Sequence, residues 1–406
     1  MHLLFLTHYF PPEVNAPASR TYEHCRIWAK EIKVTVITNF PNHPDGKLFP
    51  GYRNKLIQKE KIDGIEVIRL LTFITPNEGF LLRTINYVWF MTAAVLYVLF
   101  SGFKFDIVAA TSPQFFCGLA GKYISLLRNK PFILELRDLW PDSIVAVGAL
   151  KNKTAVGFLE KIELRLYQSA DKIISVTRSF KTALEKRGID GKKIDIIYNG
   201  ADLDLFKENL KISDAALDNY LNGGLKVGYI GTIGMAHGAE IFIESAEALK
   251  DKDVKFIIVG SGAEREKLET EIKNRKLSNI RIFPLQPKKE VPSIINKLDL
   301  FCVHLKRNKL FETVIPSKMF EGMAMKKPVL IGVRGEARTI VEESECGLFF
   351  EPENFKDMTD KILLYKNNPE KILLHGMNGY NLVIKNFNRG ILAEQFLNII
   401  RKTGKN

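Results

Sequence analysis

The chain has 406 residues, of which 46% are hydrophobic, so it can build sizeable cores and wholesale disorder is excluded. Its formal net charge of +13 favours anionic partners such as phosphorylated ligands or acidic lipids. Because no DNA- or RNA-recognition motif accompanies this charge, we expect no nucleic-acid partner.

The first half of the chain alternates short apolar strands with helices. The predicted strands are 3–6, 34–38, 65–70, 106–110, 132–136, 172–176 and 194–198, and helices include 19–31 and 158–169. Strands rich in β-branched residues without polar alternation are typical of sheets covered on both faces. This half therefore predicts a parallel sheet with helices on either side.

An uncharged run, 84–103, interrupts this pattern between Arg83 and Lys104. It is just long enough to span a bilayer, but its polar residues favour a buried or interfacial helix. The preceding segment 47–61 has five Lys or Arg against one Glu, and we expect a loop there. Together they predict a face that binds an anionic membrane surface, and the alternative is a solvated loop beside a core helix.

The strand–helix alternation restarts near Leu225, after a polar segment, 199–224, that is typical of a linker. Strands are predicted at 226–230, 255–259, 281–283, 300–304, 328–331 and 347–350, and helices include 240–249, 264–274 and 355–365. The predicted fold class is α/β, with two doubly wound Rossmann-like domains at 1–205 and 206–387. A last helix, about 388–406, fits either half, and its return to the first domain is one expectation.

Parallel sheets of this kind bind ligands at the carboxyl ends of their strands. Residues 310–325 carry a suggestive pattern there, Leu-Phe-Glu-Thr-Val-Ile-Pro-Ser-Lys-Met-Phe-Glu-Gly-Met-Ala-Met. Pro316 suits a first helical position, where the free amides and Lys318 would attract an anion. Glu321 shares a helix face with Lys318, which suits a sugar nucleotide. An ordinary surface helix with a Lys–Glu pair is an equal alternative.

Two further strand ends carry candidate site residues. Gly231 to Gly238 predicts a phosphate-binding turn, or simply a tight turn. Asp138 is a candidate acid, base or hydroxyl acceptor and Trp140 a platform for a sugar ring, although an Asp cap paired with Arg137 is as plausible.

Metal chemistry finds little support in the sequence. Asp202-Leu203-Asp204 is better interpreted as a turn than as a metal-binding Asp-x-Asp, and no zinc-ligand spacing occurs. We therefore expect neither a metal nor another cofactor.

Taken jointly, these segments resemble retaining glycosyltransferases of family 4, and more specifically the L-fucosamine-transferase-like enzymes of bacterial surface polysaccharides. The resemblance rests on Tyr9-Phe10-Pro11-Pro12-Glu13, residues 137–143, Asn199-Gly200-Ala201-Asp202, residues 231–238 and residues 316–321. It implies the GT-B fold, in which two domains face each other across a cleft.

The resemblance also implies site residues. Asp138, Lys318 and Glu321 would be catalytic, and substrate would contact Asn15, Ala16, Arg20, Arg137, Trp140, Gly231, Thr232, His237, Gly260, Thr313 and Ser317.

The chain departs from the family pattern at several of these positions. Thr313 replaces the first of two family glutamates, with Glu312 one position away, and Asn15-Ala16 replaces a frequent Gly-Gly. Thr232 and His237 replace Arg and Lys, so Lys318 is the expected partner of the diphosphate.

The expected function is transfer of a sugar from a nucleotide-sugar donor, with UDP as the expected nucleotide, to a lipid-linked saccharide acceptor in surface-polysaccharide synthesis. The resemblance implies retention at the anomeric carbon. We expect a cytoplasmic protein bound peripherally to the inner face of the membrane. The alternatives are a UDP-sugar 2-epimerase on the same architecture and a non-catalytic basic binding protein.

Overall fold

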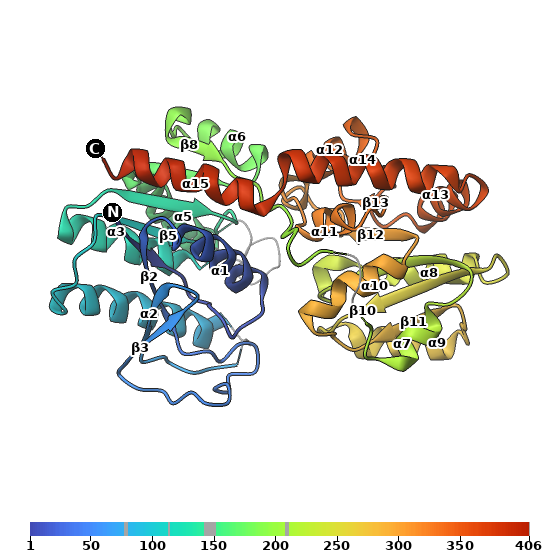
Figure 1. Ribbon diagram of the computed structural model, residues 1–406, viewed down its shortest axis with the longest axis horizontal. Helices are drawn as coiled ribbons and strands as arrows, with labels where there is room; N and C mark the ends of the chain where they lie inside the picture. Colours follow the sequence, from blue (N-terminus) through green and yellow to red (C-terminus); the bar gives the residue numbers. More distant parts are fainter. Residues whose placement is uncertain (77–79, 113, 142–151, 208–210, 406) are drawn as a thin grey trace. The chain divides into compact units, whose positions relative to one another are not determined.

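A computed structural model describes residues 1–405 except 77–79, 113, 142–151 and 208–210 (Figure 1). The chain divides into two compact units: unit 1 is Met1–Asn199 with Gly390–Asn406, and unit 2 is Gly200–Arg389. The division therefore falls a few residues before the predicted boundary at 205. The last helix, α15 (Arg389–Thr403), belongs to unit 1 from Gly390 onward.

Unit 1 is built on an eight-stranded sheet in the order β3-β4-β2-β1-β5-β6-β7-β8. Its strands are β1 (His2–Leu6), β2 (Lys33–Asn39), β3 (Ile57–Ile62), β4 (Ile65–Leu70), β5 (Ile107–Thr111), β6 (Phe132–Leu136), β7 (Lys172–Ser175) and β8 (Ile194–Ile196). All neighbours are parallel except β3, which runs antiparallel to β4. The chain order reverses between β1 and β5, which is where such sheets bind ligands.

Helices cover both faces of this sheet: α1 (Ala16–Trp28), α2 (Phe80–Phe100), α3 (Phe115–Arg128), α5 (Lys153–Ser169), α6 (Arg178–Lys186) and α15. One apolar core joins the strands to α1 and α15, and it includes Trp28, Phe396 and Ile400. The Trp28 indole also donates a 2.8 Å hydrogen bond to the carbonyl of Ala393. Figure 1 shows α15 in red, lying along unit 1 far in sequence from its neighbours.

Unit 2 is a six-stranded, wholly parallel sheet in the order β11-β10-β9-β12-β13-β14. The strands are β9 (Leu225–Ile230), β10 (Val254–Val259), β11 (Ile280–Phe283), β12 (Leu300–His304), β13 (Val329–Gly332) and β14 (Gly347–Phe349). The helices are α7 (Ala215–Tyr220), α8 (Glu240–Ala248), α9 (Arg265–Asn274), α10 (Val291–Lys297), α11 (Lys318–Ala324), α12 (Glu336–Glu343), α13 (Phe355–Asn367) and α14 (Glu370–Asn386).

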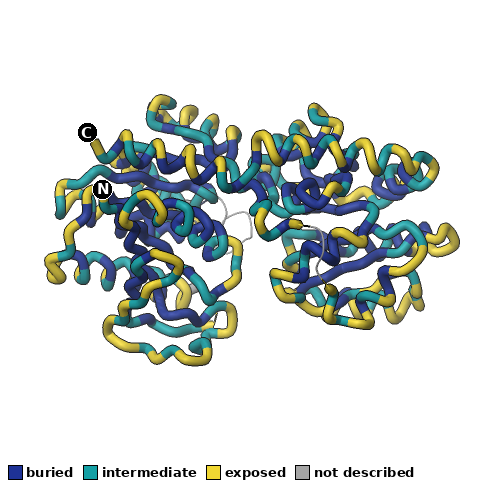
Figure 2. Tube along the Cα trace, in the orientation of Figure 1, coloured by how far each residue is buried: buried dark blue, intermediate teal, exposed yellow. Residues whose placement is uncertain are grey.

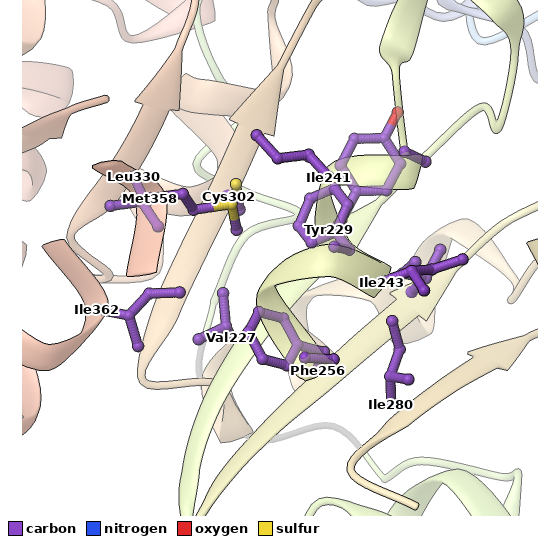
Figure 3. Packing of buried hydrophobic residues seen from close by; sticks show 14 of the residues in the cluster. Val227, Tyr229, Ile241, Ile243, Phe256, Ile280, Cys302, Leu330, Met358 and Ile362 are labelled. Atoms are coloured by element: carbon purple, nitrogen blue, oxygen red, sulfur yellow. The ribbon is translucent and has the colours of Figure 1, made fainter. Parts of the chain in front are cut away.

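Apolar side chains from these strands and from α8 and α13 form the core of unit 2 (Figure 3). The order of this sheet reverses between β9 and β12, so the loops after these two strands mark its ligand-binding edge. The α/β, doubly wound fold class predicted from the sequence is confirmed for both sheets.

The structure corrects three local predictions. Residues 57–62 form strand β3 within the predicted basic loop, and α7 lies inside the predicted linker 199–224. Pro316 is not a first helical position, because α11 begins at Lys318 with Ser317 as its N-cap.

Helix α2 is the most exposed apolar element of unit 1. Its stretch Leu81–Phe100 is long and apolar enough to cross a membrane, and only 22% of it is buried in the protein. Figure 2 shows half-buried and exposed residues along α2, in contrast to the buried strands beside it. Phe90, Ala94 and Val98 form the buried stripe, which faces the rest of unit 1.

Candidate active site

The loop after β9, Gly231 to Gly238, lies at the edge where the order of the unit 2 sheet reverses. The Gly231 amide donates a 2.9 Å hydrogen bond to the Val259 carbonyl, and the Ile233 amide donates one of 2.8 Å to the Ser261 carbonyl. A Cβ atom on Gly260 would lie 1.9 Å from the Gly231 carbonyl oxygen. Gly260, predicted to contact substrate, thus allows the loops after β9 and β10 to pack backbone against backbone.

Lys318 reaches this loop from the first turn of α11. Its Nζ lies 4.1 Å from the centroid of the Tyr229 ring and 2.5 Å from where a Cβ on Gly231 would stand. The structure therefore brings Lys318 and Gly231 together, although 86 residues separate them in the sequence. Gly231 has φ = 144°, a conformation that favours glycine, and any side chain there would displace the ammonium group.

The Lys318 ammonium is buried and, among the residues that the structure describes, finds no hydrogen-bond acceptor. Burial lowers the pKa of Lys318 from 10.5 to about 8, and the charge of Glu321 opposes this shift. A buried cation without an acceptor is costly, and an anionic ligand oxygen would offset that cost. Glu321 interacts electrostatically with Lys318, consistent with the predicted shared helix face.

His237 adds a second polar atom to the same loop. Its Nδ1 is buried and without a hydrogen-bond partner among the described residues. Burial, and next the charge of Lys318, lower the pKa of His237 to about 4, so the ring is neutral at pH 7. A neutral imidazole beside the ammonium can contact a phosphate or a sugar hydroxyl without adding a second charge.

His304, at the end of β12, fixes the far end of the loop and was not predicted from the sequence. Its Nδ1 lies 2.7 Å from the His237 carbonyl oxygen, and its Nε2 lies 3.1 Å from the amide nitrogen of Glu353. A carbonyl only accepts and an amide only donates, so the proton must sit on Nδ1. The sequence signal that could have found it is a histidine placed directly after the apolar run 300–303.

The residues near the missing family glutamate make local contacts. The Thr313 hydroxyl donates a 2.6 Å hydrogen bond to the Leu310 carbonyl of its own turn. Glu312 lies 3.8 Å from the Arg334 guanidinium, and its carbonyl packs where a Cβ on Gly335 would lie. At the place of the missing family glutamate, Glu312 therefore provides a carboxylate, which lies next to Arg334, whereas Thr313 provides only a hydroxyl group. Thr232 is exposed and Ser317 half-buried at the N-cap of α11.

In unit 1, several predicted residues meet where the sheet order reverses between β1 and β5. The Asn15 side chain caps α1 by accepting a 2.9 Å hydrogen bond from the Ala18 amide. Arg137 lies 3.5 Å from the Ala16 carbonyl, and its amide donates to the Ser112 hydroxyl after β5 at 2.9 Å. Asn15, Ala16 and Arg137 are thus brought to one edge of the sheet.

The aromatic and acidic residues after β6 have internal neighbours. The Trp140 ring stacks on Phe115 with centroids 4.2 Å apart and planes 5° from parallel, so one face of the indole is covered. Burial and then the charge of Glu163 raise the pKa of Tyr167, and the charge of Asp138 adds to this shift, which places the Asp138 carboxylate near the buried phenol.

Arg20, which the sequence predicts to contact substrate, forms a buried ion pair. Its Nε lies 2.9 Å from Glu135 Oε1, with only 3% and 1% of the two side chains exposed. The same guanidinium donates to the carbonyls of Tyr198 and Ile197. Burial alone would raise the pKa of Glu135, but the charges of Arg20 and then Arg137 hold it below its usual value.

Among the residues that the structure describes, no three His, Cys, Asp or Glu side chains group as metal ligands would.

Comparison with known proteins finds two family models that match the chain. Residues 18–205 match the family model "Glycosyltransferase Family 4", and residues 221–389 match "Glycosyl transferases group 1". The putative colanic acid biosynthesis glycosyl transferase WcaI of Escherichia coli is 23% identical over 78% of this chain and 79% of its own length. The putative teichuronic acid biosynthesis glycosyltransferase TuaH of Bacillus subtilis is 28% identical over 49% of each chain.

The fold has counterparts among solved structures. The crystal structure of Anabaena Alr3699/HepE in complex with UDP and glucose superposes with a TM-score of 0.71 over 99% of this chain and all of that one, at 16% identity. The match therefore includes both unit 1 and unit 2. The chain belongs to the family 4-like glycosyltransferases of the GT-B fold.

Proposed function

We propose that this glycosyltransferase takes its sugar from a nucleotide diphosphate sugar, with UDP as the nucleotide, bound in unit 2. The observation that carries the proposal is the buried Lys318 ammonium, which meets Gly231 at the sheet edge and has no acceptor within the described part of the chain. A diphosphate oxygen would provide that acceptor, and its charge would favour the ammonium form. The HepE structure, solved with UDP and glucose, supports the choice of nucleotide.

In the proposed reaction, the bond between the anomeric carbon and the diphosphate oxygen breaks, and the leaving diphosphate gains negative charge. Lys318 and the backbone amides of the Gly231–Gly238 loop would stabilise that charge in a site shielded from water. Glu321, one helical turn further along α11, would accept a hydrogen bond from the ribose. The acceptor hydroxyl would attack the same face that the diphosphate leaves and pass its proton to the departing diphosphate oxygen, giving retention without an enzymic nucleophile or a metal.

We also propose that the acceptor is a lipid-linked saccharide in surface-polysaccharide synthesis and that unit 1 binds the membrane peripherally on its cytoplasmic face. The names of WcaI and TuaH support the pathway class. Exposed apolar side chains on α2, with Phe100 79% and Leu81 70% exposed, support membrane contact. Exposed lysines of β3 add positive charge.

Contacts at both ends of α2 favour peripheral binding over spanning. The Trp89 indole donates a 2.6 Å hydrogen bond to the Leu71 carbonyl, and Asn86 donates to the Phe73 carbonyl. At the other end, Arg128 of α3 donates to the Val98 carbonyl at 2.8 Å. A helix crossing the bilayer would have to give up these contacts and its buried stripe.

The donor proposal is tested by UDP titration calorimetry and by turnover of a panel of nucleotide sugars. Lys318→Met should weaken UDP binding far more than uridine binding. Lys273→Met is the matched control, since it removes the same charge from the exposed face of α9. Equal losses for uridine and UDP would overturn the role of Lys318. Isomerisation of the UDP-sugar without any acceptor would instead identify an epimerase.

A further inference from the structure

An apolar groove in unit 1 is not used by the donor site. It has a volume of about 350 Å³ and runs between α2 and the hairpin formed by β3 and β4. Its lining is Leu56, Ile57, Leu70, Leu71, Trp89, Thr92, Ala93, Leu96 and Tyr97. The volume lies in the range of small-molecule sites, and seven of these nine side chains are aliphatic or aromatic without a hydroxyl group.

A polar pocket lies next to the groove along the same helix. It is lined by Arg83, Asn86 and Tyr87 of α2 and by residues after β1 and β2, including Tyr9 and His43. Tyr9 follows the carboxyl end of β1 and His43 follows that of β2, and this is the edge where such sheets bind ligands. Tyr87 and Ala93 are six residues apart, so the two sites follow one another along α2 within about 9 Å of axial rise.

Positive charge accompanies the groove. In the β3–β4 pair, Ile57 lies opposite Leu70 and Lys59 opposite Ile68. Directly paired residues of an antiparallel ladder point to the same face, so exposed Lys59 shares the groove face with Ile57. The opposite face holds the buried Arg69, paired with Glu60 at 2.6 Å.

We propose that this groove binds the hydrocarbon chain of a lipid diphosphate, the carrier of the acceptor saccharide, with its diphosphate towards Arg83. The proposal rests on the lipid-linked acceptor of the proposed function and names the part of the protein that recognises it. The apolar groove matches the hydrocarbon chain of such a molecule, and the cations Lys59 and Arg83 match its diphosphate. The polar pocket has a volume of only about 20 Å³, so the saccharide would continue past it along the sheet edge. A bilayer surface alone would need the outer face of α2 but neither the groove nor the pocket.

Farnesyl diphosphate is a suitable probe, because Trp89 lines the groove and reports on its occupant by fluorescence. The matched variants are Leu96→Gln and Leu99→Gln: both residues are exposed leucines of α2, 47% and 42% exposed, but only Leu96 lines the groove. We expect Leu96→Gln to weaken farnesyl diphosphate binding about tenfold, as loss of one apolar contact of this size predicts. Leu99→Gln should leave it unchanged, and Trp89→Phe should abolish the signal.

The second measurement is transfer to detergent-dispersed acceptors that differ only in chain length. The groove predicts a raised KM for the long-chain acceptor in Leu96→Gln, with kcat and UDP affinity unchanged. Equal effects of the two leucine variants, or no response to farnesyl diphosphate, would overturn the groove proposal while leaving UDP binding as an independent test of the donor site. Binding of farnesyl diphosphate without any sugar transfer would support the groove and count against the proposed function.

Discussion

The affinity for UDP should fall as the pH rises through the pKa of Lys318. Burial holds that pKa at about 8, against an ordinary 10.5. This difference means that the charged form of Lys318 is destabilised by about 3 kcal/mol in the ligand-free site. A bound diphosphate would favour the charged form, so UDP binding at high pH must be accompanied by proton uptake.

The magnitude follows from the fraction of Lys318 that is protonated. If the diphosphate restores an ordinary pKa, UDP should bind about tenfold more weakly at pH 9 than at pH 7. The terminal phosphate of UDP is ionised across this range, since its pKa is near 6. The neighbouring groups do not titrate there: the pKa of His237 is lowered to about 4, and that of Cys302 is raised by burial.

Calorimetry in buffers of different ionisation enthalpy measures both the affinity and the proton uptake. Lys318→Met should flatten the profile. The same variant should stabilise the ligand-free protein at pH 7, because a lysine pKa that is lower in the folded state makes stability rise with pH between about 8 and 10.5. A wild-type Kd that stays constant from pH 7 to pH 9 would refute the reasoning.

Four further outcomes are expected. Glu321→Gln should lower kcat/KM for the nucleotide sugar about 10- to 100-fold with the melting temperature unchanged, since a charged hydrogen bond contributes about 1.5–3 kcal/mol; unaltered kinetics would contradict the ribose contact. Turnover should persist in excess EDTA, and loss with rescue by manganese would show that a metal is needed. High salt should release the protein from anionic vesicles, and Lys59→Glu should weaken binding by about 1 kcal/mol or more; resistance to alkaline carbonate would indicate a spanning helix. Arg20→Met should lower the free energy of unfolding by about 3–5 kcal/mol, because Glu135 is left buried and unpaired, and urea denaturation that shows no change would contradict a stabilising ion pair.

Most of the fold could be predicted because buried parallel strands contain uninterrupted apolar runs, such as 227–230 and 300–303. Strand β3 was not predicted because its central residues, Gln-Lys-Glu-Lys, are polar and do not form an apolar run. It lies at the sheet edge, where one face is exposed and lysines are common. Helix α7 is six residues long and sits in a polar segment, so its pattern was too short to detect.

The candidate site was predictable where a motif is local. Gly231 and Lys318 each belong to a short recognisable segment, but that the two meet depends on how α11 packs against β12, the neighbour of β9 in the sheet. The ion pair of Arg20 was not predicted because its partner, Glu135, lies 115 residues away and no local signal reveals a buried ion pair. His304 was not predicted for the same reason, because its role depends on contacts with His237 and Glu353, which are distant in the sequence.

The crossing of α15 back to unit 1 bears on the order in which a ribosome can complete this protein. Unit 2 is one continuous segment, and it can fold as soon as residue 389 has emerged. Unit 1 must keep part of its core open throughout that time, since Leu392, Phe396 and Ile400 are made afterwards. At synthesis rates of about 5–20 residues per second, the exposed apolar face of α1 would wait roughly 10–40 s for its last helix, which makes the nascent first half a natural client for a chaperone.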